Sequence, residues 1–160
     1  MTLDNILEEI KKANTIAIVV HENPDGDAIG SALAMKLALE QLNKEADVII
    51  PEYPSAFSFL PGVEEIKKES EIQEYDLAIA LDCASIKLLN GFAKYFDNAK
   101  VKVAIDHHSS NTMYADYNFI SQDSPACAQL LLVAFSYFGI EVTKEIGTCI
   151  LAGIITDTGG

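Results

Sequence analysis

The chain has 160 residues, of which 49% are hydrophobic and 8% aromatic, a composition that suits one globular α/β domain with a sizeable core. The formal net charge of −13 disfavours long duplex nucleic acid as a partner, because an acidic surface repels a phosphate backbone. No apolar run approaches the roughly 18 residues of a membrane span, and no basic-then-apolar signal opens the chain. The three cysteines lack C-x-x-C spacing. We therefore expect a cytoplasmic protein with buried, reduced thiols.

The first third of the chain predicts a helix, a strand, a turn and a long helix. Apolar residues at helical spacing predict an amphipathic helix over residues 3–13. The β-branched run 15–20 predicts a buried strand, and the Ala/Leu-rich segment 28–43 predicts a helix. Gly30, near the start of this helix, allows a close approach to the sheet or to a ligand.

The turn between that strand and that helix carries three candidate metal ligands. His21 follows the strand directly, and Asp25 and Asp27 stand two residues apart. Both carboxylates can point at one spot, and an imidazole among carboxylates is a mixed ligand set for a hard to borderline divalent cation. The alternative is that Asp27 merely caps the following helix.

The middle of the chain predicts two more strands. Residues 47–50 predict a short strand, followed by an irregular segment over 52–61 and a charged segment over 64–74 that forms a solvated helix or a turn. Residues 76–81 then predict an apolar strand, which ends on the carboxylate of Asp82.

A helix over 86–96 precedes a strand over 101–105 that ends in Asp106-His107-His108. Residues 114–120 predict a short edge strand. A helix over 125–138 follows, with proline near its first turn and glycine after its end. Thr143 is expected to cap a last helix that runs to about residue 154.

Strands that alternate with helices predict a doubly wound, mostly parallel sheet flanked by helices, which binds ligands beyond the carboxyl ends of its strands. All three histidines of the chain stand at such ends beside aspartates. One cation takes about four to six ligands, and this set supplies at least six, which suggests two ions. Asp82 is the natural bridge between two ions held about 3.5–4 Å apart. Such a pair suits hydrolysis of a phosphoester or a phosphoanhydride.

Four motifs, in this order, resemble those of the DHH phosphoesterase superfamily over residues 15–160. The surroundings of the last motif are most similar to a branch of small oligoribonucleases, exonucleases that also dephosphorylate phosphoadenosine phosphate. Family II inorganic pyrophosphatases share the fold and remain an alternative, as does a non-catalytic module that binds a metal or a nucleotide. The motifs are His21-x-x-x-Asp25-x-Asp27 with Gly30-Ser31; Asp82; Asp106-His107-His108-x-x-Asn111; and Gly153-Ile154-Ile155-Thr156-Asp157-Thr158-Gly159.

The resemblance implies two Mn²⁺ ions per chain, with Mg²⁺ or Co²⁺ as substitutes. It implies that the ions share Asp82 and are otherwise held by two sets of ligands. One ion is expected on His21, Asp25 and Asp82, and the other on Asp27, Asp82, His107 and Asp157.

The resemblance also implies catalytic roles for Asp82, Asp106 and His108. Asp106 is expected to brace the site, and His108 to contact the scissile phosphate and protonate the leaving oxygen. The alternative for His108 is that it only orients another ligand. Asn111 and Ser31 are expected beside His108 as substrate-binding residues. The implied partners are short oligonucleotides or nucleotide phosphates, without long duplex nucleic acid or a membrane; a homodimer is left open.

Two features depart from the family pattern. Relatives commonly carry an arginine shortly after the second motif, where this chain has Leu88. The adjacent Lys87 is a point charge that lacks the arginine fork. The family also places a substrate-binding domain after this one, and this chain stops inside the fourth motif. We therefore expect residues 1–160 to be a DHH catalytic domain, truncated before the second domain and only weakly active alone.

Overall fold

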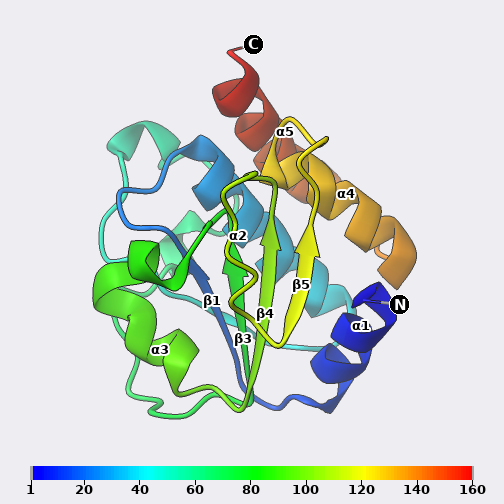
Figure 1. Cartoon of the computed structure of the whole chain (residues 1–160). Coiled ribbons are helices and arrows are strands. Elements are labelled where there is room, and N and C mark those ends of the chain that lie inside the picture. Colours follow the sequence, from blue (N-terminus) through cyan, green and yellow to red (C-terminus); the bar gives the residue numbers. More distant parts are fainter. Residues whose placement is uncertain (1, 160) are drawn as a thin grey trace.

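The computed structural model describes residues 2–159, apart from the side chains at positions 90 and 91. Its described part contains one sheet of five strands in the order β2-β1-β3-β4-β5, with every pair parallel (Figure 1). Strand order reverses between β1 and β3, which is the place where doubly wound sheets bind ligands. The predicted doubly wound fold is confirmed, and the edge strand β5 is parallel as well.

The elements have these bounds. The strands are β1 (Ile16–Val20), β2 (Asp47–Val48), β3 (Leu77–Leu81), β4 (Val101–Asp106) and β5 (Tyr117–Ile120). The α-helices are α1 (Thr2–Lys12), α2 (Gly26–Gln41), α3 (Ala93–Asp97), α4 (Cys127–Phe138) and α5 (Lys144–Thr158). The described residues also form three 3-10 helices: η1 (Ser55–Phe57), η2 (Val63–Glu65) and η3 (Ile86–Phe92).

Helix α2 begins at Gly26, two residues before the predicted start. Asp25 is its N-cap, and Asp25 Oδ1 accepts the N–H of Ala28 at 2.9 Å. Asp27 therefore lies inside the first turn, and the alternative in which Asp27 caps this helix is wrong.

Two other predicted segments differ from the structure. Only η2 is helical within the charged segment, and Lys67 beyond it forms an isolated parallel bridge with Ile49. The predicted helix over 86–96 is divided, because its first part is the 3-10 helix η3 and only α3 is α-helical.

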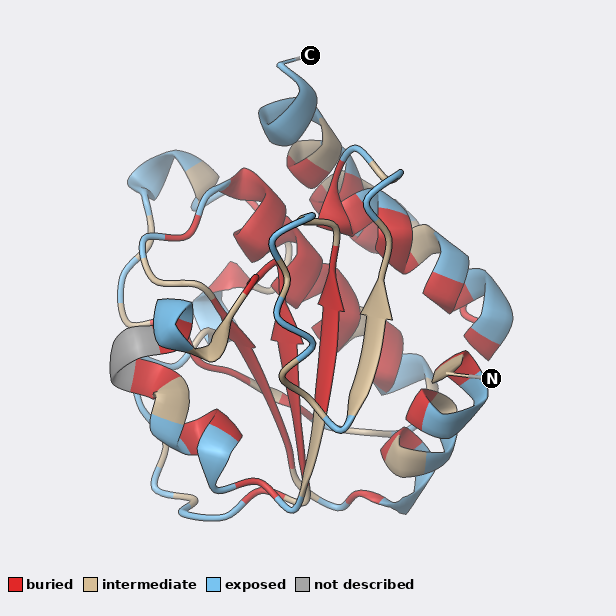
Figure 2. Cartoon of the chain, in the orientation of Figure 1, coloured by how far each residue is buried: buried red, intermediate tan, exposed pale blue. Residues whose placement is uncertain are grey.

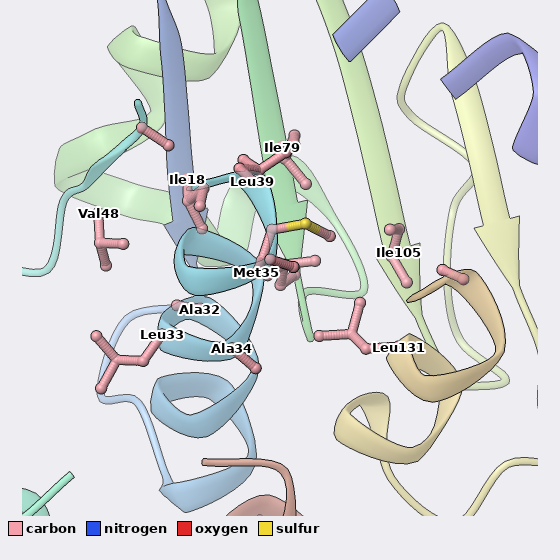
Figure 3. Close-up of a cluster of buried hydrophobic side chains, with 14 of the residues drawn as sticks. Ile18, Ala32, Leu33, Ala34, Met35, Leu39, Val48, Ile79, Ile105 and Leu131 are labelled. Atoms are coloured by element: carbon pink, nitrogen blue, oxygen red, sulfur yellow. The ribbon is translucent and has the colours of Figure 1, made fainter. Parts of the chain in front are cut away.

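The two faces of the sheet carry side chains of different size. Ile16, Ile18 and Val20 of β1 join the larger apolar cluster, which includes residues of α1, α2, α4 and α5. In Figure 3, Met35 and Leu39 of α2 lie near Ile18 and Ile79 of the sheet. The intervening strand positions thus face the opposite side.

The opposite face carries small residues, Ala17, Ala78 and Ala80, against aromatic side chains of α3, Tyr95 and Phe96. Strands β1, β3 and most of β4 are buried by the two layers, whereas β5 at the edge is half-buried (Figure 2). No helix in the described range 2–159 is long and apolar enough to cross a membrane.

Helices α2 and α5 pack unusually close together, and glycines make this possible. A Cβ atom on Gly30 would lie 2.4 Å from the carbonyl oxygen of Cys149. A Cβ atom on Gly153 would lie 2.6 Å from the Cβ of Ala128 in α4. This packing brings the C-terminal turn of α5, with Asp157, to the carboxyl edge of the sheet.

Candidate metal centre

The first set of ligands lies where the strand order reverses. His21 follows β1 and Asp82 follows the neighbouring β3. The Nε2 atom of His21 is 3.5 Å from Asp82 Oδ2 and 3.8 Å from Asp25 Oδ1. The Nδ1 atom of His21 lies 2.8 Å from the carbonyl oxygen of Glu22, which can only accept, so Nδ1 is the donor and Nε2 faces the carboxylates. We call His21, Asp25 and Asp82 the His21 group.

Charges within the His21 group reinforce one another. The Asp25 and Asp82 carboxylates raise the pKa of His21 to about 10. His21 in turn lowers the pKa of Asp25 to about 2, and the N–H of Ala28 acts in the same direction. The Asp25 side chain is 52% exposed, so this part of the centre is open to solvent.

The second set gathers around His107, and we call Asp27, His107 and Asp157 the His107 group. The Nε2 atom of His107 is 3.3 Å from Asp157 Oδ2 and 3.5 Å from Asp27 Oδ2. The same atom is 3.2 Å from Asp82 Oδ1, so Asp82 faces both groups. Asp82 together with the charges of Asp27 and Asp157 raises the pKa of His107 to about 9.

Asp27 is held by a helix other than its own. Its side chain is fully buried; Oδ2 accepts the N–H of Cys127 and Oδ1 accepts the N–H of Ala128, both at 2.9 Å. These are the first N–H groups of α4, whose N-cap residue Ala126 has no side-chain acceptor. Asp27 therefore closes the start of α4 while it faces His107. Burial, with the charge of Asp82, raises the pKa of Asp27 to about 7.

Two buried atoms at the contact between the groups fit a cation. Asp82 Oδ1 and His107 Nε2 have no hydrogen-bond partner among the described residues. An unsatisfied buried polar atom costs roughly 1–3 kcal/mol. Ligand atoms of each group lie within 4.8 Å of one another, and the donor set of imidazole nitrogen and carboxylate oxygen suits a divalent ion. The residues thus fit two cations that share Asp82.

The backbone at Asp82 is itself unusual. Its φ angle is +56°, in the left-handed region that Gly, Asn and Asp adopt most readily. Non-glycine residues in this region cluster at functional sites. The conformation lies directly at the end of β3, between His21 and His107.

His108 lies beside this centre and is held from behind. Its Nδ1 atom is 2.7 Å from Asp106 Oδ1, which raises the pKa of His108 and leaves Nε2 available. Asp106 is fully buried, and its Oδ2 accepts an N–H of Asn111 at 3.0 Å. Burial opposes ionisation of Asp106, but His108 and Asn111 keep the pKa of Asp106 below its usual value. Asp106 thus holds the ring of His108, and its ligand atom also lies within 4.8 Å of those of Asp82 and His107.

The structure brings every predicted metal ligand to one edge of the sheet: His21, Asp25, Asp27, Asp82, His107 and Asp157. Ser31, predicted to bind substrate, is fully buried, and its hydroxyl lies 3.4 Å from Asp27 Oδ1. It therefore contacts a predicted metal-binding residue. Asn111 uses both ends of its amide, on Asp106 and on the N–H of Met113. The backbone of Leu88 is near the first motif, since its carbonyl accepts the N–H of Glu22 at 2.7 Å.

Sequence reasoning missed the start of α4 as part of the site. The residues that precede it, Pro125 and Ala126, offer no side chain that can cap a helix. A helix start without a capping residue is the signal that could have indicated an acceptor from elsewhere in the chain.

Known proteins similar to this chain are found by sequence and by structure. The N-terminal domain of the DHH family matches residues 15–154. The bifunctional oligoribonuclease and PAP phosphatase NrnA of Thermus thermophilus is 34% identical over 157 residues, which cover 96% of this chain and 47% of that protein. The chain spans about half the length of the curated relatives it matches.

Solved structures that are similar to the chain include the following two. An exopolyphosphatase-related protein from Bacteroides fragilis has a TM-score of 0.93 at 28% identity, over 99% of this chain and 50% of that one. The exonuclease RecJ bound to manganese has a TM-score of 0.54 at 15% identity, over 97% and 42% of the two chains. The likeness to RecJ concerns the fold alone.

Proposed function

Because this chain belongs to the DHH family, we propose that it is the catalytic domain of a manganese-dependent phosphoesterase that hydrolyses short oligoribonucleotides or phosphoadenosine phosphate. The observation that carries the proposal is the contact of two buried atoms between two sets of candidate ligands: Asp82 Oδ1 and His107 Nε2 lie 3.2 Å apart, and neither has a hydrogen-bond partner among the described residues. The relative from Thermus thermophilus, an oligoribonuclease and PAP phosphatase by name, supports the substrate class.

The two groups would hold one ion each. His21, Asp25 and Asp82 would hold the first, and the His107 group with Asp82 the second. Nitrogen among oxygen ligands favours Mn²⁺ over Mg²⁺, and the RecJ structure contains manganese. Ions bound there would activate water and neutralise negative charge on a phosphoryl group. Because the carboxylates of Asp27 and Asp82 are buried, they would hold the positive charge of the ions in a fixed position.

His108 would act on the substrate. Asp106 favours the charged form of the imidazole and would orient it, so that Nε2 could donate to a phosphate oxygen and then give its proton to the leaving oxygen. Asn111 holds Asp106 in place through its amide N–H. Ser31 would steady Asp27, and both Asn111 and Ser31 would support the reaction through the side chains that they contact.

A second candidate is hydrolysis of a phosphoanhydride, pyrophosphate or polyphosphate. The similarity to an exopolyphosphatase-related protein favours it, at a TM-score of 0.93. The same metal ligands would serve both reactions. The choice between a phosphoester and a phosphoanhydride substrate would therefore depend on residues around the phosphate and not on the metal centre.

The test has a binding arm and an activity arm. Calorimetric titration of the folded chain with Mn²⁺ should give two ions per chain, and absence of any stoichiometric ion would refute the proposal. Under saturating Mn²⁺, the chain should cleave a diadenylate or phosphoadenosine phosphate, slowly, in preference to pyrophosphate. A preference for pyrophosphate would favour the second candidate.

A further inference from the structure

A polar pocket of about 550 Å³ lies beside the metal centre. Small-molecule sites commonly have volumes of about 300–1,000 Å³. The residues that line the pocket come from the connection between β4 and β5, from β5 itself and from the loop between β5 and α4. Figure 1 shows the course of these three segments. His108 belongs to its lining, so the pocket begins where the centre ends.

The sheet places the pocket one strand beyond the metal centre. The sheet order runs from β1 through β3 and β4 to β5, and the first three of these strands lead to His21, Asp82 and Asp106-His107-His108. Ile120, which lines the pocket, is the register partner of Asp106. A phosphate over β3 and β4 would therefore have its attached group over β5.

Strand β5 gives the pocket its floor. Tyr117 and Phe119 pack against the larger apolar cluster, so the alternation of a strand turns Asn118 and Ile120 to the other face. Both of these residues line the pocket. Helix α1 packs against β5 on the side of the larger apolar cluster, whereas the pocket lies on the other face.

The lining fits a neutral group better than a second phosphate. It contains amides and hydroxyls, including Gln122 and Ser121, and one carboxylate, Asp123, but neither lysine nor arginine. The carboxylate and the net charge of −13 would repel a phosphate placed inside. Amides and hydroxyls can donate to and accept from a sugar or a base.

Met113 supplies an apolar, polarisable surface at this pocket. It is 57% exposed, and its φ angle of +54° is rare for a residue with a side chain. Asn111 Oδ1 accepts the N–H of Met113 at 2.7 Å and so ties this conformation to the residue that holds Asp106. A thioether makes favourable contacts with aromatic rings. A nucleobase is such a ring.

The geometry points to a nucleoside subsite: the pocket binds the ribose and base of the nucleotide whose phosphate occupies the metal centre. This inference rests on the proposed function, because the phosphate position comes from it. It adds that Met113 contacts the base and that the nucleotide extends toward β5, away from His21.

The test uses the full chain and nuclear magnetic resonance, with adenosine monophosphate and inorganic phosphate as probes. With Mg²⁺ present, phosphate should shift amide signals near His108 only. Adenosine monophosphate should in addition shift the signals of Asn118, Ser121 and Gln122. Met113→Gly should weaken adenosine monophosphate binding by about twofold to thirteenfold, the range for loss of a sulfur–aromatic contact, and leave phosphate binding unchanged.

The matched control is Asn43→Gly. Asn43 also has a positive φ angle, +61°, so both substitutions relax the backbone, but Asn43 is exposed outside the pocket. Equal affinity of Met113→Gly and the unsubstituted chain for adenosine monophosphate would overturn the subsite, as would identical shifts from the two probes. Failure of Mn²⁺ to broaden the signals of the His21 and His107 groups would instead overturn the proposed function.

Discussion

The His21 group and the His107 group draw ligands from one short turn but are held in different ways. Asp25 caps its own helix, through the N–H of Ala28 three residues away, and its side chain is half exposed. Asp27 is fully buried and binds the N–H groups of Cys127 and Ala128 in another helix. The position of Asp25 is thus set locally, by its own helix, whereas that of Asp27 depends on how α2, α4 and α5 pack.

This difference shows that neighbouring residues can belong to separate structural units. A substitution in the packing of α2, α4 and α5 should disturb the His107 group and spare the His21 group. Substitution of the shared residue, Asp82, should disturb both.

The largest effect is expected for Asp82→Asn, because Asp82 faces both groups. Asparagine tolerates the left-handed backbone at this position, so the fold should persist. Loss of a residue that only orients a ligand costs about 10–100-fold in metal affinity or activity, and loss of a shared ligand should exceed about 100-fold. Titration with Mn²⁺ and hydrolysis at saturating Mn²⁺ measure the two consequences.

The control for Asp82→Asn is Asp97→Asn, an exposed aspartate at the end of α3. It removes the same charge without touching either group. If both variants bound two ions and retained activity, Asp82 would not be the shared ligand.

Gly153→Ala should disturb the His107 group through packing and leave the His21 group unchanged. The added Cβ would lie 2.6 Å from Ala128 Cβ and 3.0 Å from Asp27 Oδ1. Overpacking of this kind costs about 1–3 kcal/mol of folding free energy, and it should weaken the Mn²⁺ site of the His107 group.

The control is Gly147→Ala in the same helix, where the added Cβ meets nothing closer than Val142 Cγ1 at 3.9 Å. This substitution should raise the free energy of unfolding by about 0.5–1 kcal/mol. Urea unfolding of both variants measures this, and similar stabilities would contradict the close-packing account.

Cys127→Pro removes one N–H donor from Asp27 with little backbone disturbance. Proline is accepted at the first position of a helix, and Ala126 before it is already extended, with φ −154° and ψ 151°. Loss of this bond to Asp27 Oδ2 should weaken one ion site about tenfold and leave the other unchanged. Cys127→Ala keeps the N–H and serves as the control in the same Mn²⁺ titration. Equal affinities of the two variants would show that the backbone bond does not position Asp27.

The smallest effect is the pH dependence of the metal-free chain. The pKa values of His21, His107 and Asp27 are raised to about 10, 9 and 7, so the folded chain holds more protons than the unfolded chain above about pH 4. The free energy of unfolding should therefore fall as the pH rises from about 5 to about 9. Asp25, with its pKa lowered to about 2, acts in the opposite sense only below about pH 4.

Denaturant unfolding in the presence of a chelator, at several pH values, measures this trend. Saturating Mn²⁺ should remove or reverse it, because metal binding requires deprotonated ligands. A metal-free chain with stability that rises toward pH 9 would contradict the expected charge states of both histidines.

Most of the sheet could be predicted because its strands are continuous apolar runs between polar ends. The strands β1, β3 and β4 begin and end within one residue of the predicted 15–20, 76–81 and 101–105. Helix α5 continues past its predicted end near 154 to Thr158, and the hydroxyls of Thr156 and Thr158 donate to the carbonyls of Ala152 and Ile154. Gly159, with a φ angle of +78°, follows its end, as is common after a helix.

The ligands at strand ends could be predicted from position, since parallel strands present their carboxyl ends at one edge. The anchoring of Asp27 could not, because its partner Cys127 is 100 residues away and contributes only a backbone N–H. Asp25 and Asp27 are both acceptable caps by residue type, and only the structure shows that each caps a different helix.

The left-handed backbone of Asp82 has a consequence for how this family can change over time. A lineage that no longer needs the metal is free to lose the carboxylate, but the end of β3 must still turn in the same way. Asparagine and glycine are the replacements that keep this turn without strain. A descendant with Asn or Gly at position 82 and an intact apolar sheet would therefore be a folded protein that has given up catalysis, and this history could be recognised from its sequence.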